Sequence, residues 1–277
     1  MSSDDRPVSI SNKKQLVGYL EWYLASGVDW VLEEYPVSRF TDVSVDKVSK
    51  DPVLSIVGGH ALSSAAELSS GKDLGPIATS ASVAGSANSL GELLEIMERF
   101  DGCALKHTAM NLVFGDGNPD SHLMLVGEAP GKDEDLRGLP FVGRSGKLLD
   151  KMLLSIGVTR ASCYITNIVP WRPPGNRTPS SQEVAACLPF VVRHIELVKP
   201  KILLLLGGAA TIALTGLKEG ILKLRGNWMK LKIGELSVRA IATFHPAYLL
   251  RQPLQKRLAW QDLCAVREAL SNNDFCM

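Results

Sequence analysis

The sequence predicts an α/β fold, a three-layer α/β/α sandwich with a short, mostly parallel central sheet. Four apolar runs are typical of buried strands, at 123–126, 164–169, 202–206 and 240–244. Helical patterns alternate with these runs, at 146–156, 181–198 and 253–270. Strands that alternate with helices predict a parallel sheet that is covered on both faces. We expect this domain to occupy residues 90–277, because Ser89 and Glu92 form a capping-box pattern that opens a helix.

Two segments of different character precede this domain. Residues 1–62 predict an acidic, helical N-terminal extension in which Leu16, Leu20 and Leu24 recur at roughly helical spacing among several Trp and Tyr residues. These aromatic helices either pack against the main domain or dock a protein partner, and both interpretations stay open. Residues 63–89 contain eight Ser, six Ala and three Gly, which predicts a flexible linker.

Charge is distributed unevenly along the 277 residues, although 30 Lys+Arg nearly balance 29 Asp+Glu. Residues 1–90 carry a net charge of −4, whereas the stretches 137–177 and 218–257 carry +6 and +7. A polyanion responds to such a local field more than to the net charge of the chain. The basic stretches therefore indicate either a nucleic-acid partner or a solvated basic face, and the ordinary apolar content of 45% excludes a wholly disordered chain.

The sequence gives no sign of a membrane or an oxidising compartment. The most apolar run, 202–206, is far shorter than the ~20 residues of a membrane span. The N-terminus is polar and acidic, unlike a secretory signal. The five cysteines are scattered and form no CxxC pair, which is typical of a reducing compartment. We therefore expect a cytoplasmic protein that acts as a monomer without a membrane partner.

Polar residues follow three of the predicted strands at corresponding positions. Glu128 lies in GEAPG after the first strand, Asn167 lies near the end of the second, and His245 follows the last. Ligands bind beyond the carboxyl ends of strands in open parallel sheets. A carboxylate, an amide and an imidazole are therefore expected to face one another at one edge of the sheet.

Three loops near this edge predict contacts to a nucleic acid. Phe141, between Pro140 and Gly143, could stack on a base, although it could equally be buried in the core. A stiff basic loop suits a phosphodiester backbone, and its candidate residues are Arg172, Pro173, Pro174 and Arg177. A wedge that displaces a base from the stack needs apolar side chains beside a basic one, and the candidates are Leu249, Leu250 and Arg251.

The ordered motifs GEAPG, GLPFVG, TNIVPWRPPGNRTP and HPAYLLR together resemble those of the type-4 (family 4) uracil-DNA glycosylases, over about residues 100–267. The resemblance implies a hydrolase of N-glycosyl bonds in base excision repair. Such an enzyme flips deoxyuridine out of single- or double-stranded DNA, releases uracil and leaves an abasic site. The sequence does not indicate which strand form is preferred or whether other deaminated bases are accepted.

The resemblance also implies roles for individual residues. Glu128 would position water and steady the developing sugar cation, and His245 would donate a hydrogen bond to uracil O2. Asn167 would read the edge of uracil, and Phe141 would stack on the flipped base. Ala129 and Glu134 would complete the wall of the uracil pocket.

Most members of this family hold a [4Fe–4S] cluster on four cysteines, and here only two of the four positions are cysteines. Cys103 and Cys187 match two of the positions, while Phe100 and Trp171 occupy the others. Phe and Trp cannot ligate iron, and a cluster needs a ligand at every corner. We therefore expect no cofactor, with apolar side chains filling the place of the cluster.

The sequence allows two functions other than that of an active glycosylase. A catalytically silent DNA-binding module would share the fold, but it would not require Glu128, Asn167 and His245 together. An unrelated nucleotide-binding enzyme would need a Gly-rich phosphate loop after the first strand, where Glu128 would instead repel a phosphate.

Overall fold

The computed structural model describes residues 53–56 and 76–272 and contains one seven-stranded sheet in the order β1-β6-β7-β5-β3-β4-β2. Its strands are β1 (Val53–Ile56), β2 (Asp116–Gly117), β3 (Leu123–Gly127), β4 (Tyr164–Asn167), β5 (Ile202–Leu206), β6 (Trp228–Ile233) and β7 (Leu236–Thr243). The four central strands β4, β3, β5 and β7 are all parallel. The flanking strands β2 and β6 run antiparallel to their inner neighbours. The predicted α/β class with a mostly parallel centre is thereby confirmed.

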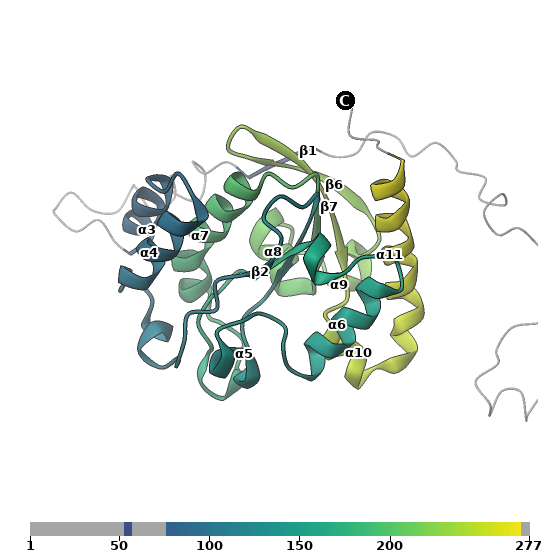
Figure 1. The fold of residues 1–277 in the computed structure, drawn as a ribbon, viewed down its shortest axis with the longest axis horizontal. Coiled ribbons are helices and arrows are strands. Elements are labelled where there is room, and N and C mark those ends of the chain that lie inside the picture. Colours follow the sequence, from purple (N-terminus) through teal and green to yellow (C-terminus); the bar gives the residue numbers. More distant parts are fainter. Residues whose placement is uncertain (1–52, 57–75, 273–277) are drawn as a thin grey trace, which may run out of the picture. The chain divides into compact units, whose positions relative to one another are not determined.

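Helices cover both faces of this sheet and create the three layers (Figure 1). The longer helices are α3 (Pro76–Gly85), α4 (Leu90–Arg99), α6 (Arg144–Leu154), α7 (Ser181–Val198), α8 (Gly208–Thr215) and α11 (Lys256–Ser271). The shorter ones are α5 (Lys132–Arg137), α9 (Ile221–Leu224) and α10 (Pro246–Arg251). Single 3₁₀ turns occur at Ala104–His107, Arg160–Ser162, Pro174–Asn176 and Pro253–Gln255. None of the helices in the described ranges is long and apolar enough to cross a membrane.

Alternate residues of each central strand point into two separate hydrophobic cores, one on each face of the sheet. Met124 and Leu203 pack with α3, α4, α7 and α8 on one face, whereas Leu125 and Leu204 pack with α6, α10 and α11 on the other. All of these strand residues are fully buried. This two-sided burial explains why the strands are continuous apolar runs rather than alternating patterns.

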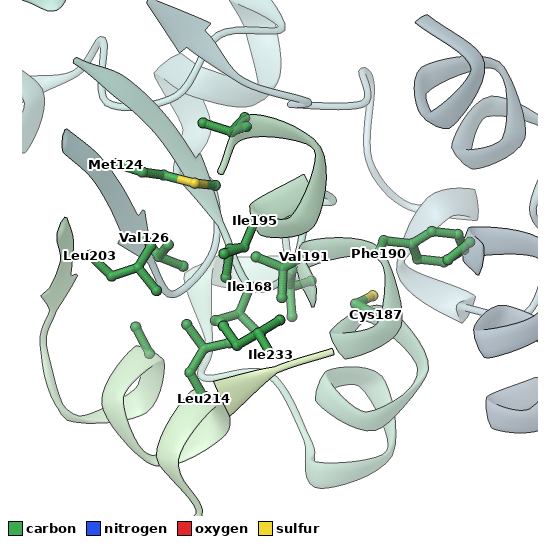
Figure 2. Packing of buried hydrophobic residues seen from close by; sticks show 14 of the residues in the cluster. Met124, Val126, Ile168, Cys187, Phe190, Val191, Ile195, Leu203, Leu214 and Ile233 are labelled. Carbon is green, nitrogen blue, oxygen red and sulfur yellow. The ribbon is translucent and has the colours of Figure 1, made fainter. Parts of the chain in front are cut away.

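Helix α7 has the bounds that its helical pattern predicts, 181–198. Ser180 and Glu183 form a reciprocal capping box that satisfies exposed N–H groups at its start. Figure 2 shows how its apolar side chains, among them Val191 and Ile195, pack against the sheet. The helix also carries Cys187 into the core, which matters for the cluster position considered below.

The prediction of a flexible linker is wrong for its second half. Residues 76–85 form α3, and Ala84 and Ala87 are completely buried against the core that α7 shares. The guanidinium of Arg193 on α7 donates two hydrogen bonds to the Ala87 carbonyl, at 2.7 and 2.9 Å. Small side chains contribute little hydrophobic area, but they let two helices approach closely. Composition alone does not show this packing. Residues 63–75 of the proposed linker lie outside the described residues.

The N-terminal extension differs from the prediction where the structure describes it. Residues 53–56 form strand β1 rather than a helix, and β1 pairs in parallel with β6. The remainder of the predicted extension, including its aromatic helices, lies outside the described residues. Strand β6 was not predicted, because its alternation of buried and exposed residues over 228–233 is a one-sided pattern unlike the central apolar runs.

Candidate active site

Glu128, Asn167 and His245 lie together at the carboxyl ends of β3, β4 and β7. They line one cavity of about 470 Å³, as do Ala129, Glu134 and Phe141. The structure therefore brings all six residues that the sequence places in the catalytic and base-binding groups into one site. This volume lies within the range of small-molecule pockets.

The glycine at the end of β3 determines how the site is shaped. Gly127 is the direct cross-strand neighbour of Asn167. A Cβ atom on Gly127 would collide with Asn167 Oδ1 and would lie 2.6 Å from Phe141 Cζ. The amide and the aromatic ring therefore converge over a backbone position that has room for no side chain.

Glu134 binds the backbone N–H groups of the loop that carries Phe141. The buried carboxylate of Glu134 accepts hydrogen bonds from the N–H groups of Val142, Gly143 and Gly131, at 2.9, 2.8 and 3.1 Å. All of these donors belong to backbone. Glu134 thus acts on the shape of the loop, and its carboxylate is already occupied before any ligand enters.

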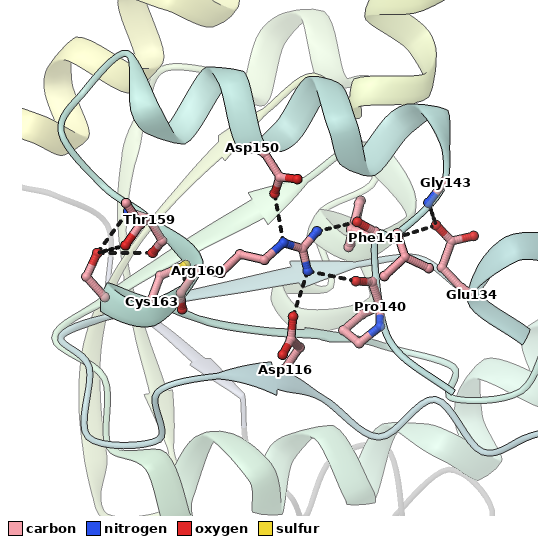
Figure 3. A network of polar contacts seen from close by, with 11 residues as sticks. Asp116, Glu134, Pro140, Phe141, Gly143, Asp150, Thr159, Arg160 and Cys163 are labelled. Atoms are coloured by element: carbon pink, nitrogen blue, oxygen red, sulfur yellow. Dashed lines mark hydrogen bonds and ion pairs between the residues drawn. The ribbon is translucent and has the colours of Figure 1, made fainter. Parts of the chain in front are cut away.

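Arg160 holds the same loop from its carbonyl side (Figure 3). Its guanidinium donates to the carbonyls of Pro140 and Phe141, while Asp116 and Asp150 pair with it at 2.7 and 2.8 Å. Phe141 has φ = 53°, a left-handed backbone that is uncommon for a bulky residue. The two charged groups together hold this unfavourable conformation in place, and a strained residue held in this way is typical of a functional position.

The rings of Phe141 and His245 contact each other in the wall of the cavity. Their ring centroids are 5.6 Å apart, with an interplanar angle of 34°. Phe141 is only 4% exposed, so its ring is fixed within the wall of the cavity. A planar ligand that enters beside it would meet an aromatic face that is already positioned.

Asn167 carries a buried polar atom without a partner. Its side-chain Oδ1 forms no hydrogen bond with any described residue, although Asn167 is only 4% exposed. An unsatisfied buried acceptor costs about 1–3 kcal/mol. A ligand N–H in the cavity would satisfy it.

His245 is held as a neutral hydrogen-bond donor. Its Nδ1 accepts a hydrogen bond from the Ala247 N–H at 3.1 Å at the start of α10, which leaves the ring proton on Nε2. Burial and the nearby Arg251 cation lower the pKa of His245 to about 4. Gly207, with φ = 92°, lets β5 end against this ring, since a Cβ there would lie 2.9 Å from His245 Cβ.

Glu128 stands at the turn that leaves β3. Burial raises the pKa of its carboxyl group above the usual range, and no described residue neutralises the carboxylate with an ion pair. Its backbone carbonyl accepts a hydrogen bond from the Val169 N–H at 3.0 Å, which ties the turn to the chain beyond β4. The free carboxylate beside the cavity can attract a positive charge or polarise a water molecule.

The predicted DNA-contacting loop after β4 is stiffened by its own arginines. Arg172 donates to Asn176 Oδ1 at 2.6 Å and lies 3.8 Å from Asp135 Oδ2. Arg177 makes a two-pronged ion pair with Glu183, at 2.6 and 2.8 Å. Pro173 and Arg177 line the cavity, whereas Pro174 is exposed beyond it.

The prediction that Leu249 forms part of a wedge is wrong. Leu249 is completely buried in the core beneath α10 and is inaccessible to a base stack. Leu250 is 38% exposed and borders a neighbouring cavity with Arg251. Adjacent residues on a helix point about 100° apart, so only one of the two leucines can face outward.

Cys103 and Cys187 lie side by side in the core, with their Sγ atoms 3.7 Å apart. The Phe100 ring stacks near Trp171, with centroids 6.5 Å apart, and packs edge-on against Phe190 at 4.8 Å. The Cys187 thiol donates to Cys103, and this bond and burial raise the pKa of Cys187. Aromatic carbon thus fills two of the four corners, and no group of three metal-ligating side chains occurs in the described part of the chain. These residues do not fit an iron–sulfur cluster.

Other residues, which no sequence motif indicates, also shape the site. Ser145, Asn176 and Thr178 also line the cavity. Ser145 lies in the first turn of α6, and Asn176 has a left-handed backbone with φ = 55°. The backbone conformation, and no catalytic sequence motif, places these side chains at the cavity. Arg160 was missed because it acts through backbone carbonyls, which leave no pattern in the sequence.

Comparison with known proteins places this fold and site in a family. The family model of the uracil DNA glycosylase superfamily matches residues 114–264. A type-4 uracil-DNA glycosylase from Thermotoga maritima is 42% identical over 165 residues, 58% of this chain and 84% of the relative. Relatives of the same name from Saccharolobus solfataricus and Archaeoglobus fulgidus are 38% and 41% identical, over 63% and 54% of this chain and 83% and 78% of their own lengths. This chain therefore belongs to the uracil-DNA glycosylase superfamily, in its type-4 family.

Proposed function

We propose that the protein is a uracil-DNA glycosylase that hydrolyses the N-glycosidic bond of deoxyuridine in DNA. The observation that carries this proposal is the unpartnered Oδ1 of Asn167, buried beside Phe141 and opposite the neutral His245. We infer that Asn167 binds the edge of one pyrimidine, that Phe141 contacts its face, and that His245 donates to its O2 atom. The relatives named above as type-4 uracil-DNA glycosylases support the same reaction.

Asn167 selects uracil by the direction of its hydrogen bonds. Its Oδ1 accepts from uracil N3–H, and its amide nitrogen donates to O4. Cytosine lacks the N3–H proton and has an amino donor at position 4, so both contacts would fail. A site that is built to bond a polar edge rejects a base without it by a large factor, because buried groups are left unpaired.

Phe141 receives the base after the nucleotide leaves the stack. Extrusion of a nucleotide costs a few kcal/mol, and less when the base is mispaired. Stacking on an aromatic ring returns about 1–3 kcal/mol per base. Because Glu134 and Arg160 hold the Phe141 loop before DNA binds, little further ordering is needed when the base arrives.

His245 and Glu128 act on opposite ends of the breaking bond. When the bond between N1 and C1′ breaks, the electron pair moves to uracil and leaves a sugar with oxocarbenium character. The Nε2–H of neutral His245 donates to uracil O2, where negative charge develops in the transition state. The Glu128 carboxylate stabilises the sugar cation and orients the water that adds to C1′, so that uracil and an abasic site result.

The residues at the cluster position support activity without an iron–sulfur group. Phe100 and Trp171 bury apolar surface where two thiolates would be needed. The Phe100 ring at the end of α4 packs on Trp171 in the loop after β4 and on Phe190 of α7. This corner lies in the core on the α7 face of the sheet, and none of its four residues lines the cavity. The corner therefore supplies no side chain to the cavity in which the base would bind.

A gel assay on uracil-containing oligonucleotides, single- and double-stranded, tests the proposed reaction. The wild-type protein is expected to produce alkali-labile abasic sites at uracil and none at cytosine. A catalytically silent DNA-binding module would bind both strands without product. Absence of abasic product from both substrates would rule out the proposed activity.

Asn167→Asp is expected to lower uracil excision by about 10²–10³-fold, the range for loss of one transition-state donor. The new carboxylate cannot donate to O4. Single-turnover rates on matched uracil and cytosine oligonucleotides measure both activity and selectivity. Asn118→Asp is the control, because Asn118 lies outside the cavity. Unchanged discrimination between the two bases would remove Asn167 from base recognition.

The acid side of the pH–rate profile is expected to report Glu128 and not His245. Lowering the pH through the raised pKa of Glu128 protonates the carboxylate and removes its charge, so the rate falls. His245 stays neutral through this range because its pKa is about 4. The acid limb should therefore persist in His245→Gln at reduced rate and vanish in Glu128→Gln. A limb that disappears in His245→Gln would contradict the assignment.

Arg160→Gln is expected to lower kcat/KM by about tenfold, equal to about 1.4 kcal/mol. Loss of the guanidinium releases the carbonyls of Pro140 and Phe141, so the ring of Phe141 is no longer positioned. Asp150→Asn, which removes only a half-exposed partner, is the matched control. In a Phe141→Ala background the same Arg160 substitution should have little further effect. Equal effects in both backgrounds would show that Arg160 acts on stability alone.

Protein purified without oxygen is expected to contain far less than one iron per chain and no absorbance band near 400 nm. Chelators should leave its excision rate unchanged. Cys103→Ala and Cys187→Ala should each retain activity, since neither thiol lines the cavity. Stoichiometric iron with that band would overturn the proposal of a cluster-free enzyme.

A further inference from the structure

A second cavity of about 410 Å³ adjoins the first and has a cationic rim. Lys132, Arg144 and Arg251 line it, and all three side chains are exposed. Ser145, Asn176, Ala247 and Arg251 also line the first cavity, so the two cavities are continuous. The rim therefore lies directly beside the cavity that would hold the base.

These three cations differ from the other arginines near the site. Arg160, Arg172 and Arg177 each make an ion pair with a carboxylate. The side chains of Lys132, Arg144 and Arg251 make no ion pair or hydrogen bond with any residue that the structure describes. A cation that is already neutralised attracts a phosphate less strongly than a free one does.

Two carboxylates lie in the same cavity and have different effects. The oxygens of Glu134 are occupied by three backbone N–H groups, so its charge is partly compensated. Asp133 is exposed and has no such partners, so it offsets one of the three positive charges. The rim keeps an excess of positive charge after both are counted.

We propose that Lys132, Arg144 and Arg251 bind backbone phosphates that flank the extruded nucleotide. This inference rests on the proposed function and assigns the phosphate contacts to the unpaired cations, not to the paired Arg172 and Arg177. Leu250, exposed on the same rim, lies where it can contact the stack that the nucleotide leaves. The paired arginines keep their own role, which is to stiffen the loop after β4.

The salt dependence of DNA binding tests this assignment. Fluorescence anisotropy measures the affinity for a single-stranded oligonucleotide that carries a stable abasic-site analogue, over a series of KCl concentrations. Each lost phosphate contact should reduce the slope of log K against log salt by about 0.7. Lys132→Gln and Arg144→Gln are each expected to show this reduction, and the double variant about twice as much. Asp133→Asn should instead tighten binding.

Lys232→Gln is the matched control, because Lys232 is an exposed lysine of β6. It pairs with Ser237 at the start of β7, at the end of the strands opposite to the site. Its slope should equal that of the wild type. Single-turnover excision by Lys232→Gln should also equal that of the wild type, because Lys232 lines neither cavity. Wild-type slopes for both Lys132→Gln and Arg144→Gln, in a protein that excises uracil, would overturn this inference and leave the proposed function intact. If the wild type excises nothing, the proposed function fails, and the same slopes still decide where DNA phosphates bind.

Discussion

The pairing of Gly127 with Asn167 across β3 and β4 is the constraint on which the site depends. The parallel register brings the two strand ends level, and the missing side chain at Gly127 leaves room for the Asn167 amide and the Phe141 ring. The same register along β5 and β7 places Gly207 against His245. Strand pairing, which no single motif encodes, thus sets the distances between the reacting groups.

Hydrogen bonding divides the site into a rigid frame and a free acceptor. The Glu134 carboxylate accepts hydrogen bonds from backbone N–H groups of the Phe141 loop, and the Arg160 guanidinium donates to its carbonyls. The Ala247 N–H donates to one ring nitrogen of His245. The buried side-chain oxygen that lacks a partner among the described residues is Asn167 Oδ1. In a preorganised site the groups need no reorientation when the substrate arrives. The free energy of binding is therefore not spent on ordering these groups and can stabilise the transition state.

The corner formed by Cys103, Cys187, Phe100 and Trp171 shows how a family position can change chemistry while the fold remains. Aromatic stacking and burial join α4, α7 and the loop after β4 there. Burial of large aromatic side chains supplies stability of the same kind that a cross-link would, without a requirement for metal or thiolate. None of the four residues lines the active cavity, although the loop after β4 that carries Trp171 also supplies Pro173 and Arg177 to it.

The sequence by itself determined the α/β class, the central strands, the helix 181–198 and the residues that meet in the cavity. The class, the strands and the helix follow from apolar runs and capping patterns, which are local features of the sequence. The cavity residues follow from the order of the motifs and the resemblance to a family. It did not determine that α3 folds within a Ser- and Ala-rich segment, that Leu249 is buried, or that Arg160 supports Phe141. Those features depend on which surfaces face each other after folding. The contrast between paired and unpaired arginines also arose only in three dimensions, because charge along a chain does not show which carboxylate lies within reach.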